Sequence, residues 1–124
     1  MNYLKARGNA MTFALQGLLS AFRKEAHLRV HLFVAVAVTA AGFYFGISLT
    51  DWCIVLTCIF MVMVIELINS AFERLCDLAM PDIHPTVKYI KDISAGAVLL
   101  TCIFSALVGI IVFFPYLAAQ MRSL

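Results

Sequence analysis

The sequence predicts an all-α integral membrane protein in which an amphipathic surface helix precedes three transmembrane helices. Hydrophobic residues make up 64% of the 124 positions and charged residues only 13%, which lies far outside the range of soluble domains of this length. Three long runs are almost free of charge, as membrane-spanning helices require. The net charge is +2 without a long basic run, which argues against nucleic-acid binding. We expect one membrane domain over residues 1–124.

The first predicted element is a surface helix over about residues 9–28. Within residues 9–22 apolar side chains recur with the helical period on one side and polar side chains occupy the other, a pattern typical of helices that lie in the membrane surface. Extending this helical wheel places Glu25 on the apolar side beside Phe22, so its carboxylate should point toward protein. Glu25 is therefore a candidate site residue. The alternative is an interfacial ion pair with Arg29, one helical turn further on.

Three spans are predicted over about residues 30–50, 52–73 and 93–119. The first contains nineteen consecutive uncharged residues, which is ~28 Å of helix and enough to cross once. A short turn ending at Trp52 separates it from the second span. The segment MPDIHPT, with Pro81 and Pro85, rules out an uninterrupted helix before the third.

The placement of lysine and arginine predicts the orientation. Five precede the first span, none lies in the first loop, three lie in the second loop and one follows the third span. In chain order they are Lys5, Arg7, Arg23, Lys24, Arg29, Arg74, Lys88, Lys91 and Arg122. By the positive-inside rule the N-terminus and the second loop are cytoplasmic.

The stretch ELINSAFERLCD, residues 66–77, places a polar stripe at the end of the second span. On a helix the polar side chains gather on one face, opposite a wholly apolar one. They are Glu66, Asn69, Ser70, Glu73 and Asp77. Since a carboxylate facing lipid costs several kcal/mol, the stripe must face protein, water or a ligand. Counted from Trp52, Glu66 lies ~21 Å along a core ~30 Å thick, whereas Glu73 reaches its surface.

Carboxylates and a lysine gathered at the cytoplasmic surface suit a magnesium nucleotide, because hard cations take oxygen ligands and phosphates need positive charge. Glu25, Glu73, Lys91 and Asp92 share this depth, and Glu66 lies deeper. A deeper acid could accept the proton of a lipid hydroxyl, which makes phosphoryl transfer from ATP to a lipid alcohol physically reasonable. No GxxxxGK[ST] or GxGxxG motif is present. The competing class is a small transporter or ion channel subunit, in which Glu66 would relay protons or bind an ion.

Three segments carry a resemblance to a known family. They are AFRKEAHLRVH, ELINSAFERLCDL and, after a loop, HPTVKYIKDISAGAVLL. Together they resemble the small bacterial diacylglycerol kinases, a family that includes the undecaprenol kinases, over residues 12–115. The resemblance implies an ATP- and Mg²⁺-dependent lipid kinase of the bacterial cytoplasmic (inner) membrane. It also implies a homotrimer with active sites shared between subunits. The HP of the loop, the AGAVLL run and IFSALVGIIVFFP favour undecaprenol as substrate, with diacylglycerol second.

The resemblance assigns roles to individual residues. Glu66 would be the general base with Asn69 beside it, and Glu25 and Glu73 would bind Mg²⁺. Lys91 and Asp92 would be catalytic and contact the nucleotide. Further nucleotide contacts would come from Phe13, Gly17, Glu25, Glu73, Asp77, Asp82, Ile83 and His84.

Two positions depart from the family pattern. Phe13 stands where some relatives have a tyrosine that stacks on the nucleotide, so the ring is kept and the hydroxyl lost. The family's N-terminal arginine aligns with Ala6, and Arg7 is one position away.

Overall fold

The computed structural model describes residues 3–124, with side chains from residue 8 onward. It contains four helices: α1 (Tyr3–Lys24), α2 (Ala26–Phe45), α3 (Leu49–Ala79) and α4 (Pro85–Arg122). The last three are long and apolar enough to cross a membrane, which confirms the prediction of an all-helical protein with three candidate spans. The side chains of Lys5, Ala6 and Arg7 lie outside the described residues.

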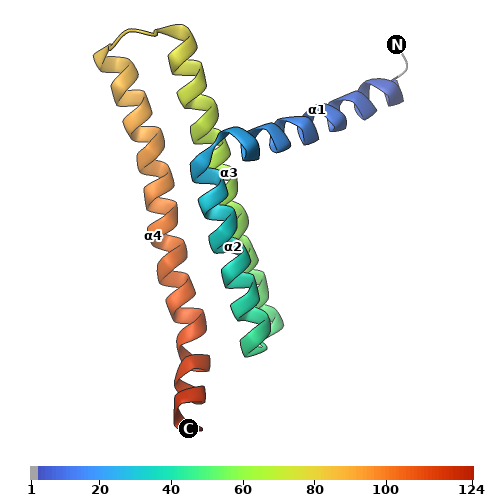
Figure 1. Ribbon diagram of the computed structural model, residues 1–124, viewed down its shortest axis with the longest axis vertical. Coiled ribbons are helices and arrows are strands. Elements are labelled where there is room, and N and C mark those ends of the chain that lie inside the picture. Colours follow the sequence, from blue (N-terminus) through green and yellow to red (C-terminus); the bar gives the residue numbers. More distant parts are fainter. Residues whose placement is uncertain (1–2) are drawn as a thin grey trace.

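The three long helices run alongside one another, whereas α1 projects steeply away from them (Figure 1). The far ends of α3 and α4 continue past the level of α1 and are joined by a short loop. Large apolar side chains of α1 are exposed on this single chain, among them Met11, Phe13 and Leu19. The polar segment of α3 and the start of α4 therefore lie at the same end of the bundle as α1.

The chain leaves α1 at Glu25, which has an extended backbone (φ −98°, ψ 112°) and is the N-cap of α2. Arg29 donates from Nη1 to the carbonyls of Phe22 and Arg23, at 3.2 and 2.8 Å, and so satisfies acceptors that the end of α1 leaves open. α1 thus ends at Lys24, four residues before the predicted end at residue 28. Because Glu25 is not helical, the helical period of α1 does not determine the direction of its side chain. The alternative of an ion pair between Glu25 and Arg29 was wrong, because Arg29 serves as this cap.

The turn between α2 and α3 is fixed by glycine and by a side-chain cap. Gly46 has φ 59°, a left-handed conformation that ends α2 at Phe45, earlier than the predicted residue 50. Ser48 then caps α3, since its Oγ accepts the N–H of Asp51 at 3.1 Å. Nearby, a Cβ on Gly42 would lie 2.7 Å from the ring of Trp52, so α2 and this ring approach closely only because Gly42 has no side chain.

The break between α3 and α4 follows the two prolines. α3 continues to Ala79, beyond the predicted end of the span at 73, and α4 begins with Pro85 in its first turn. His84 caps α4 through Nδ1, which accepts the N–H of Thr86 at 3.2 Å.

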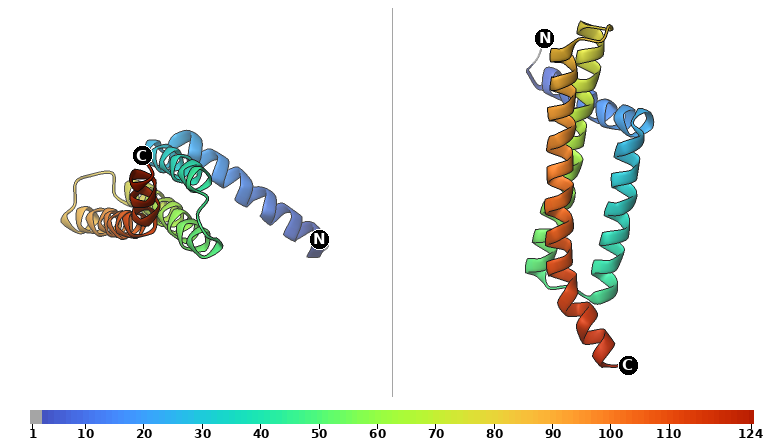
Figure 2. Two further views of the ribbon diagram at one scale, coloured as in Figure 1. Left: turned by 90° about the horizontal axis from the view of Figure 1, so that it is seen from below. Right: turned by 90° about the vertical axis from the view of Figure 1, so that its left-hand side faces the viewer.

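A small core holds the helices together at the end opposite α1. Its buried members are Ile47, Val55 and Val112, with Phe45 and Phe113 packed against them. In the same region the hydroxyl of Tyr116 accepts the N–H of Ser48 at 3.1 Å and donates to the carboxylate of Asp51. These contacts fasten α4, near Pro115, to the turn between α2 and α3. Figure 2 shows that α2 and α4 diverge above this point.

Candidate functional site

The polar stripe of α3 is buried at its deep end. Glu66 is only 3% exposed, and Asn69 and Ser70 are buried beside it. The opposite face, which includes Ile68, Phe72 and Leu75, is exposed, as the helical period predicts. The stripe therefore faces protein at Glu66 even in a single chain.

Asn69 is held from the neighbouring helix. The hydroxyl of Ser94 on α4 donates to Oδ1 of Asn69 at 2.7 Å. Within the described residues no side-chain donor bonds to the carboxylate of Glu66. Asn69 is thus positioned by Ser94, a residue that the sequence did not single out.

A cluster of charged side chains lies two to three turns beyond Glu66, where Glu73 and Asp77 of α3 approach Lys91 of α4. Lys91, which precedes the apolar run starting at Ile93, donates to the carboxylate of Asp77 at 2.7 Å. This hydrogen bond, together with the negative charges of Asp77 and Glu73, raises the pKa of Lys91 above its ordinary value. The lysine is therefore firmly protonated at neutral pH and fixed to α3.

Asp92 does not share the partner of Lys91. Its carboxylate pairs with Lys88, one turn earlier on the same helix, and both side chains are well exposed. The two members of the predicted catalytic pair thus have different partners: Lys91 reaches across to α3, whereas Asp92 remains at the surface of α4. An exposed pair of this kind contributes little to stability, so Asp92 is free to take another partner.

Glu25 is brought to α3 by an arginine. Nη2 and Nε of Arg74 donate to the same carboxylate oxygen of Glu25, at 2.8 and 3.2 Å. Arg74 follows Glu73 directly in the chain. The hydrogen bond and charge of Glu25 raise the pKa of this guanidinium most, and the negative charge of Glu73 contributes less. Sequence reasoning counted Arg74 only as a loop charge, because no helical period relates residues 25 and 74.

The remaining predicted nucleotide contacts fall in two separate places. Gly17 and Glu25 line a cavity of about 360 Å³ between α1 and α3, together with Lys24, Ser70 and Arg74. Phe13 is exposed one turn further out along α1. By contrast, Asp82, Ile83 and His84 are exposed in the loop between α3 and α4, on the side of the bundle away from α1 (Figure 1). One chain therefore does not gather all of these residues into a single pocket.

The two predicted metal ligands, Glu25 and Glu73, would suit Mg²⁺ bound with a nucleotide better than Mg²⁺ in a closed protein cage. The described residues contain no group of three or more His, Cys, Asp or Glu side chains that could hold a metal ion. Mg²⁺ in nucleotide sites needs only one or two carboxylates, since phosphates and water complete its octahedron. Glu25 and Glu73 would provide that number of carboxylates.

These features define a class: a helical protein with three candidate membrane spans, a buried acid, and a cluster of charged side chains beyond that acid at the same end of the bundle as α1. Comparison with known proteins makes the class specific. Residues 12–113 match the model of the prokaryotic diacylglycerol kinase family. The chain belongs to this family, and its class is that of the membrane lipid kinases.

Individual relatives agree with the family. The chain is 32% identical over 116 residues to an undecaprenol kinase of Bacillus subtilis, a match that covers 94% of each protein. It is 33% identical over 110 residues to a diacylglycerol kinase of Synechocystis, covering 88% of this chain and 63% of that protein. A diacylglycerol kinase of Haemophilus influenzae is 31% identical over 107 residues, 86% of this chain and 91% of the relative.

Proposed function

We propose that the protein transfers the γ-phosphoryl group of ATP to the hydroxyl of a membrane lipid alcohol, with undecaprenol as the favoured substrate. The observation that carries this proposal is Glu66, an acid buried between α3 and α4 and without a hydrogen-bond donor among the described residues. It lies where an apolar span meets the charged cluster of Glu73, Asp77 and Lys91. A lipid hydroxyl and a nucleotide can meet only at such a boundary.

The reaction follows from these positions. Glu66 accepts the proton as the hydroxyl oxygen attacks the γ-phosphorus, and the bond from that phosphorus to the bridging oxygen breaks, releasing ADP. Lys91 stabilises the negative charge of the phosphoryl group, and Asn69, fixed by Ser94, positions groups beside the base. Bound Mg²⁺ would supply charge neutralisation on the phosphates, with Glu25 and Glu73 as its protein ligands.

We also propose that the working form is a homotrimer whose active sites are shared between subunits. The support is the separation described above: α1, with Phe13 and Gly17, and the loop with Asp82, Ile83 and His84 lie on different sides of one chain. Contacts from a neighbouring subunit would bring such parts together. Association would also cover the polar stripe where it emerges from the bundle.

The support for undecaprenol comes from sequence features and from the relatives. The loop and the third span carry the segments that favour this branch, and the undecaprenol kinase of Bacillus subtilis aligns over nearly the full length of both chains. Diacylglycerol is the second candidate, since several relatives bear that name. The placement of lysine and arginine supports a cytoplasmic N-terminus in the bacterial inner membrane.

The test is direct phosphorylation. Purified protein in detergent receives undecaprenol or diacylglycerol with labelled ATP, and labelled lipid is measured. A labelled lipid product that requires Mg²⁺ is expected, with undecaprenol phosphorylated faster. The alternative, a transporter or ion channel subunit, predicts flux across liposomes without ATP. Such flux in the absence of any phosphorylated lipid would refute the kinase proposal.

A further inference from the structure

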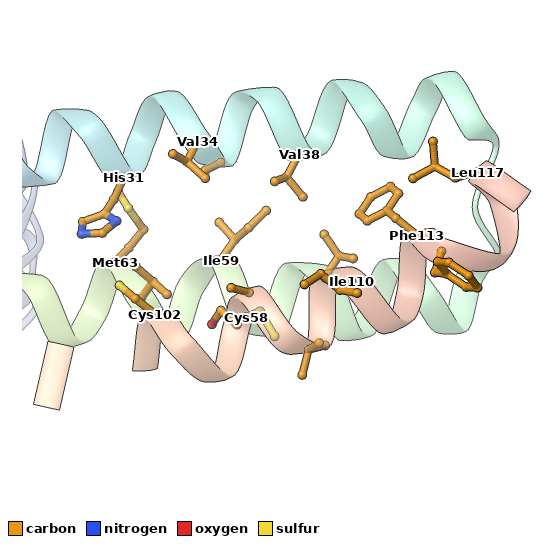
Figure 3. Close-up of a pocket in the computed structure, with 18 residues that line it drawn as sticks. His31, Val34, Val38, Cys58, Ile59, Met63, Cys102, Ile110, Phe113 and Leu117 are labelled. Carbon is orange, nitrogen blue, oxygen red and sulfur yellow. The ribbon is translucent and has the colours of Figure 1, made fainter. Parts of the chain in front are cut away.

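The cavity between α1 and α3 differs in chemistry from the groove among the candidate spans. The groove lies between α2, α3 and α4, and its lining is almost wholly apolar (Figure 3). The cavity is lined in part by charged side chains: two cations, Lys24 and Arg74, and one anion, Glu25. Lys24 forms no ion pair within the described residues. The net charge of the lining is therefore positive, which favours an anionic ligand.

Arg74 has hydrogen-bonding capacity that its present partner does not use. Nε and Nη2 both donate to Oε1 of Glu25, at 3.2 and 2.8 Å. The remaining N–H groups of the guanidinium bond to no atom among residues 8–124. The side chain of Arg74 is 64% exposed, so its pair with Glu25 contributes little to stability and can be exchanged for another.

Arg74 lies on the α1 side of the polar stripe, away from the side that contacts α4. Ser70 precedes Arg74 by one helical turn on α3, and both line the cavity beside α1. On the other side, Asn69 is hydrogen-bonded to α4. Glu73 follows Asn69 by four residues and Ser70 by three, so it lies between these two sides. A nucleotide bound with Mg²⁺ at Glu73 would thus have Lys91 of α4 on one side and Arg74 on the other.

We propose that Arg74 exchanges partners when the metal–nucleotide complex binds: its guanidinium leaves Glu25 and donates to phosphate oxygens of the nucleotide. The inference rests on the proposed function and adds a phosphate-binding residue to its nucleotide site. The released carboxylate of Glu25 is then available to Mg²⁺. Carboxylate and phosphate both accept the forked donors of a guanidinium, so the exchange replaces one charge-assisted pair with another. Glu25 keeps a cation beside it throughout, and the phosphates gain one.

Nucleotide binding without metal separates this role from a purely structural one, in which Arg74 only holds Glu25 at the start of α2. The whole protein in detergent and EDTA is titrated with ATP and with adenosine, each displacing a fluorescent ATP analogue. Glu25→Gln removes the carboxylate that competes for Arg74, so it should bind ATP about two- to fivefold more tightly than the wild type. Adding Arg74→Gln to this variant should weaken ATP binding about tenfold, and binding of adenosine, which has no phosphate, less than about twofold. Arg23→Gln in the same background is the charge-matched control and should change both affinities by less than about twofold.

Equal losses with ATP and adenosine, or no loss of ATP binding on Arg74→Gln, would overturn the proposal. Arg74→Lys covers the case in which the glutamine variant does not fold. It keeps the charge but not the forked donors, so in the Glu25→Gln background it should weaken ATP binding by about threefold. An unchanged affinity for ATP in Arg74→Lys would contradict the forked contact with phosphate.

A second measurement tests the exchange with metal present and does not depend on catalysis. Binding of Mn²⁺ alone is compared with binding of a non-hydrolysable ATP analogue at saturating Mn²⁺. Arg74→Gln should bind Mn²⁺ alone more tightly, because the competing cation is gone, but should bind the analogue about three- to tenfold more weakly, because the phosphate contact is lost. Tighter binding of both would show that Arg74 only competes with the metal, which would refute the exchange.

The outcome for the wild type separates the two proposals. If it binds the nucleotide but phosphorylates no lipid, the proposed function fails, and the binding comparisons still decide the role of Arg74. A wild type that binds no nucleotide would overturn both.

Discussion

The guanidinium of Arg74 on α3 holds the carboxylate of Glu25, the N-cap of α2, through two hydrogen bonds to one oxygen. The side chain of Glu25 is only 21% exposed, and this arginine is the cation that neutralises it. A metal ion that uses Glu25 must compete with Arg74. The ion pair therefore bears directly on metal affinity.

Arg74→Gln should tighten Mn²⁺ binding in the absence of nucleotide, because it removes this competing cation. The expected gain is about two- to fivefold, the range of an exposed ion pair. Titration of Mn²⁺ followed by electron paramagnetic resonance measures it. Arg23→Gln is the control, since it removes an equal charge near α1 from a residue without an ion pair among the described residues. Equal tightening in both variants would show that only the net charge matters.

Glu25→Gln and Glu73→Gln should each raise the Mg²⁺ concentration needed for half-maximal activity. The amide keeps the shape of the side chain but loses the charge that binds a hard cation, so a shift of about tenfold or more is expected. The measurement is a magnesium titration of lipid phosphorylation, with size-exclusion chromatography to check that the oligomer is intact. An unchanged magnesium dependence in both variants would remove these residues from the metal site.

The sequence predicted the elements whose causes are local. Long uncharged runs predicted the three candidate spans, and Pro81 and Pro85 predicted the break before α4. The helical period of residues 66–77 predicted that Glu66 faces away from lipid, and it is buried. These signals depend on composition and on helical geometry within one segment. The predictions based on these signals agree with the structure because the period of a helix is set within its own segment and does not depend on its neighbours.

The features that the sequence did not predict depend on contacts between distant segments. The helical period continues through Glu25, and the sequence has no glycine or proline there. The break is stabilised instead by the bond from Arg74 and by Arg29 at the end of α1. Likewise, Ser94 meets Asn69 only because α4 packs on α3. The apolar groove between α2, α3 and α4 likewise depends on the separations of three helices, which no pattern within one segment contains.

Asp77→Asn should lower the pKa of Lys91, because the hydrogen bond and charge of Asp77 raise it. Since folding raises the pKa of Lys91, its bond to Asp77 stabilises the folded protein. This contribution to the free energy of unfolding is fully present below the ordinary pKa of 10.5 and is lost as the pH rises through the folded value. The alkaline limb of the activity profile should therefore move to lower pH in Asp77→Asn. Profiles measured between about pH 8 and 11 test this, and Lys88→Gln, which leaves the bond between Lys91 and Asp77 in place, controls for a general change of charge. An unshifted alkaline limb in Asp77→Asn would show that the loss of activity at high pH is not caused by deprotonation of Lys91.

Glu66→Gln tests the proposed base most directly. The amide fills the same buried space between α3 and α4 but cannot accept the proton of the lipid hydroxyl. Because Glu66 lies deeper than the charged cluster, nucleotide binding should be almost unchanged. The loss should therefore appear in kcat and much less in the KM for ATP, as for an interaction made mainly in the transition state. General-base steps contribute ~10²- to 10⁴-fold, and a fall in kcat of that order is expected.

The variant is assayed with undecaprenol and ATP at saturation, alongside Asp92→Asn. If Glu66→Gln keeps more than about a tenth of the activity while Asp92→Asn loses it, the proton is accepted by Asp92 at the start of α4.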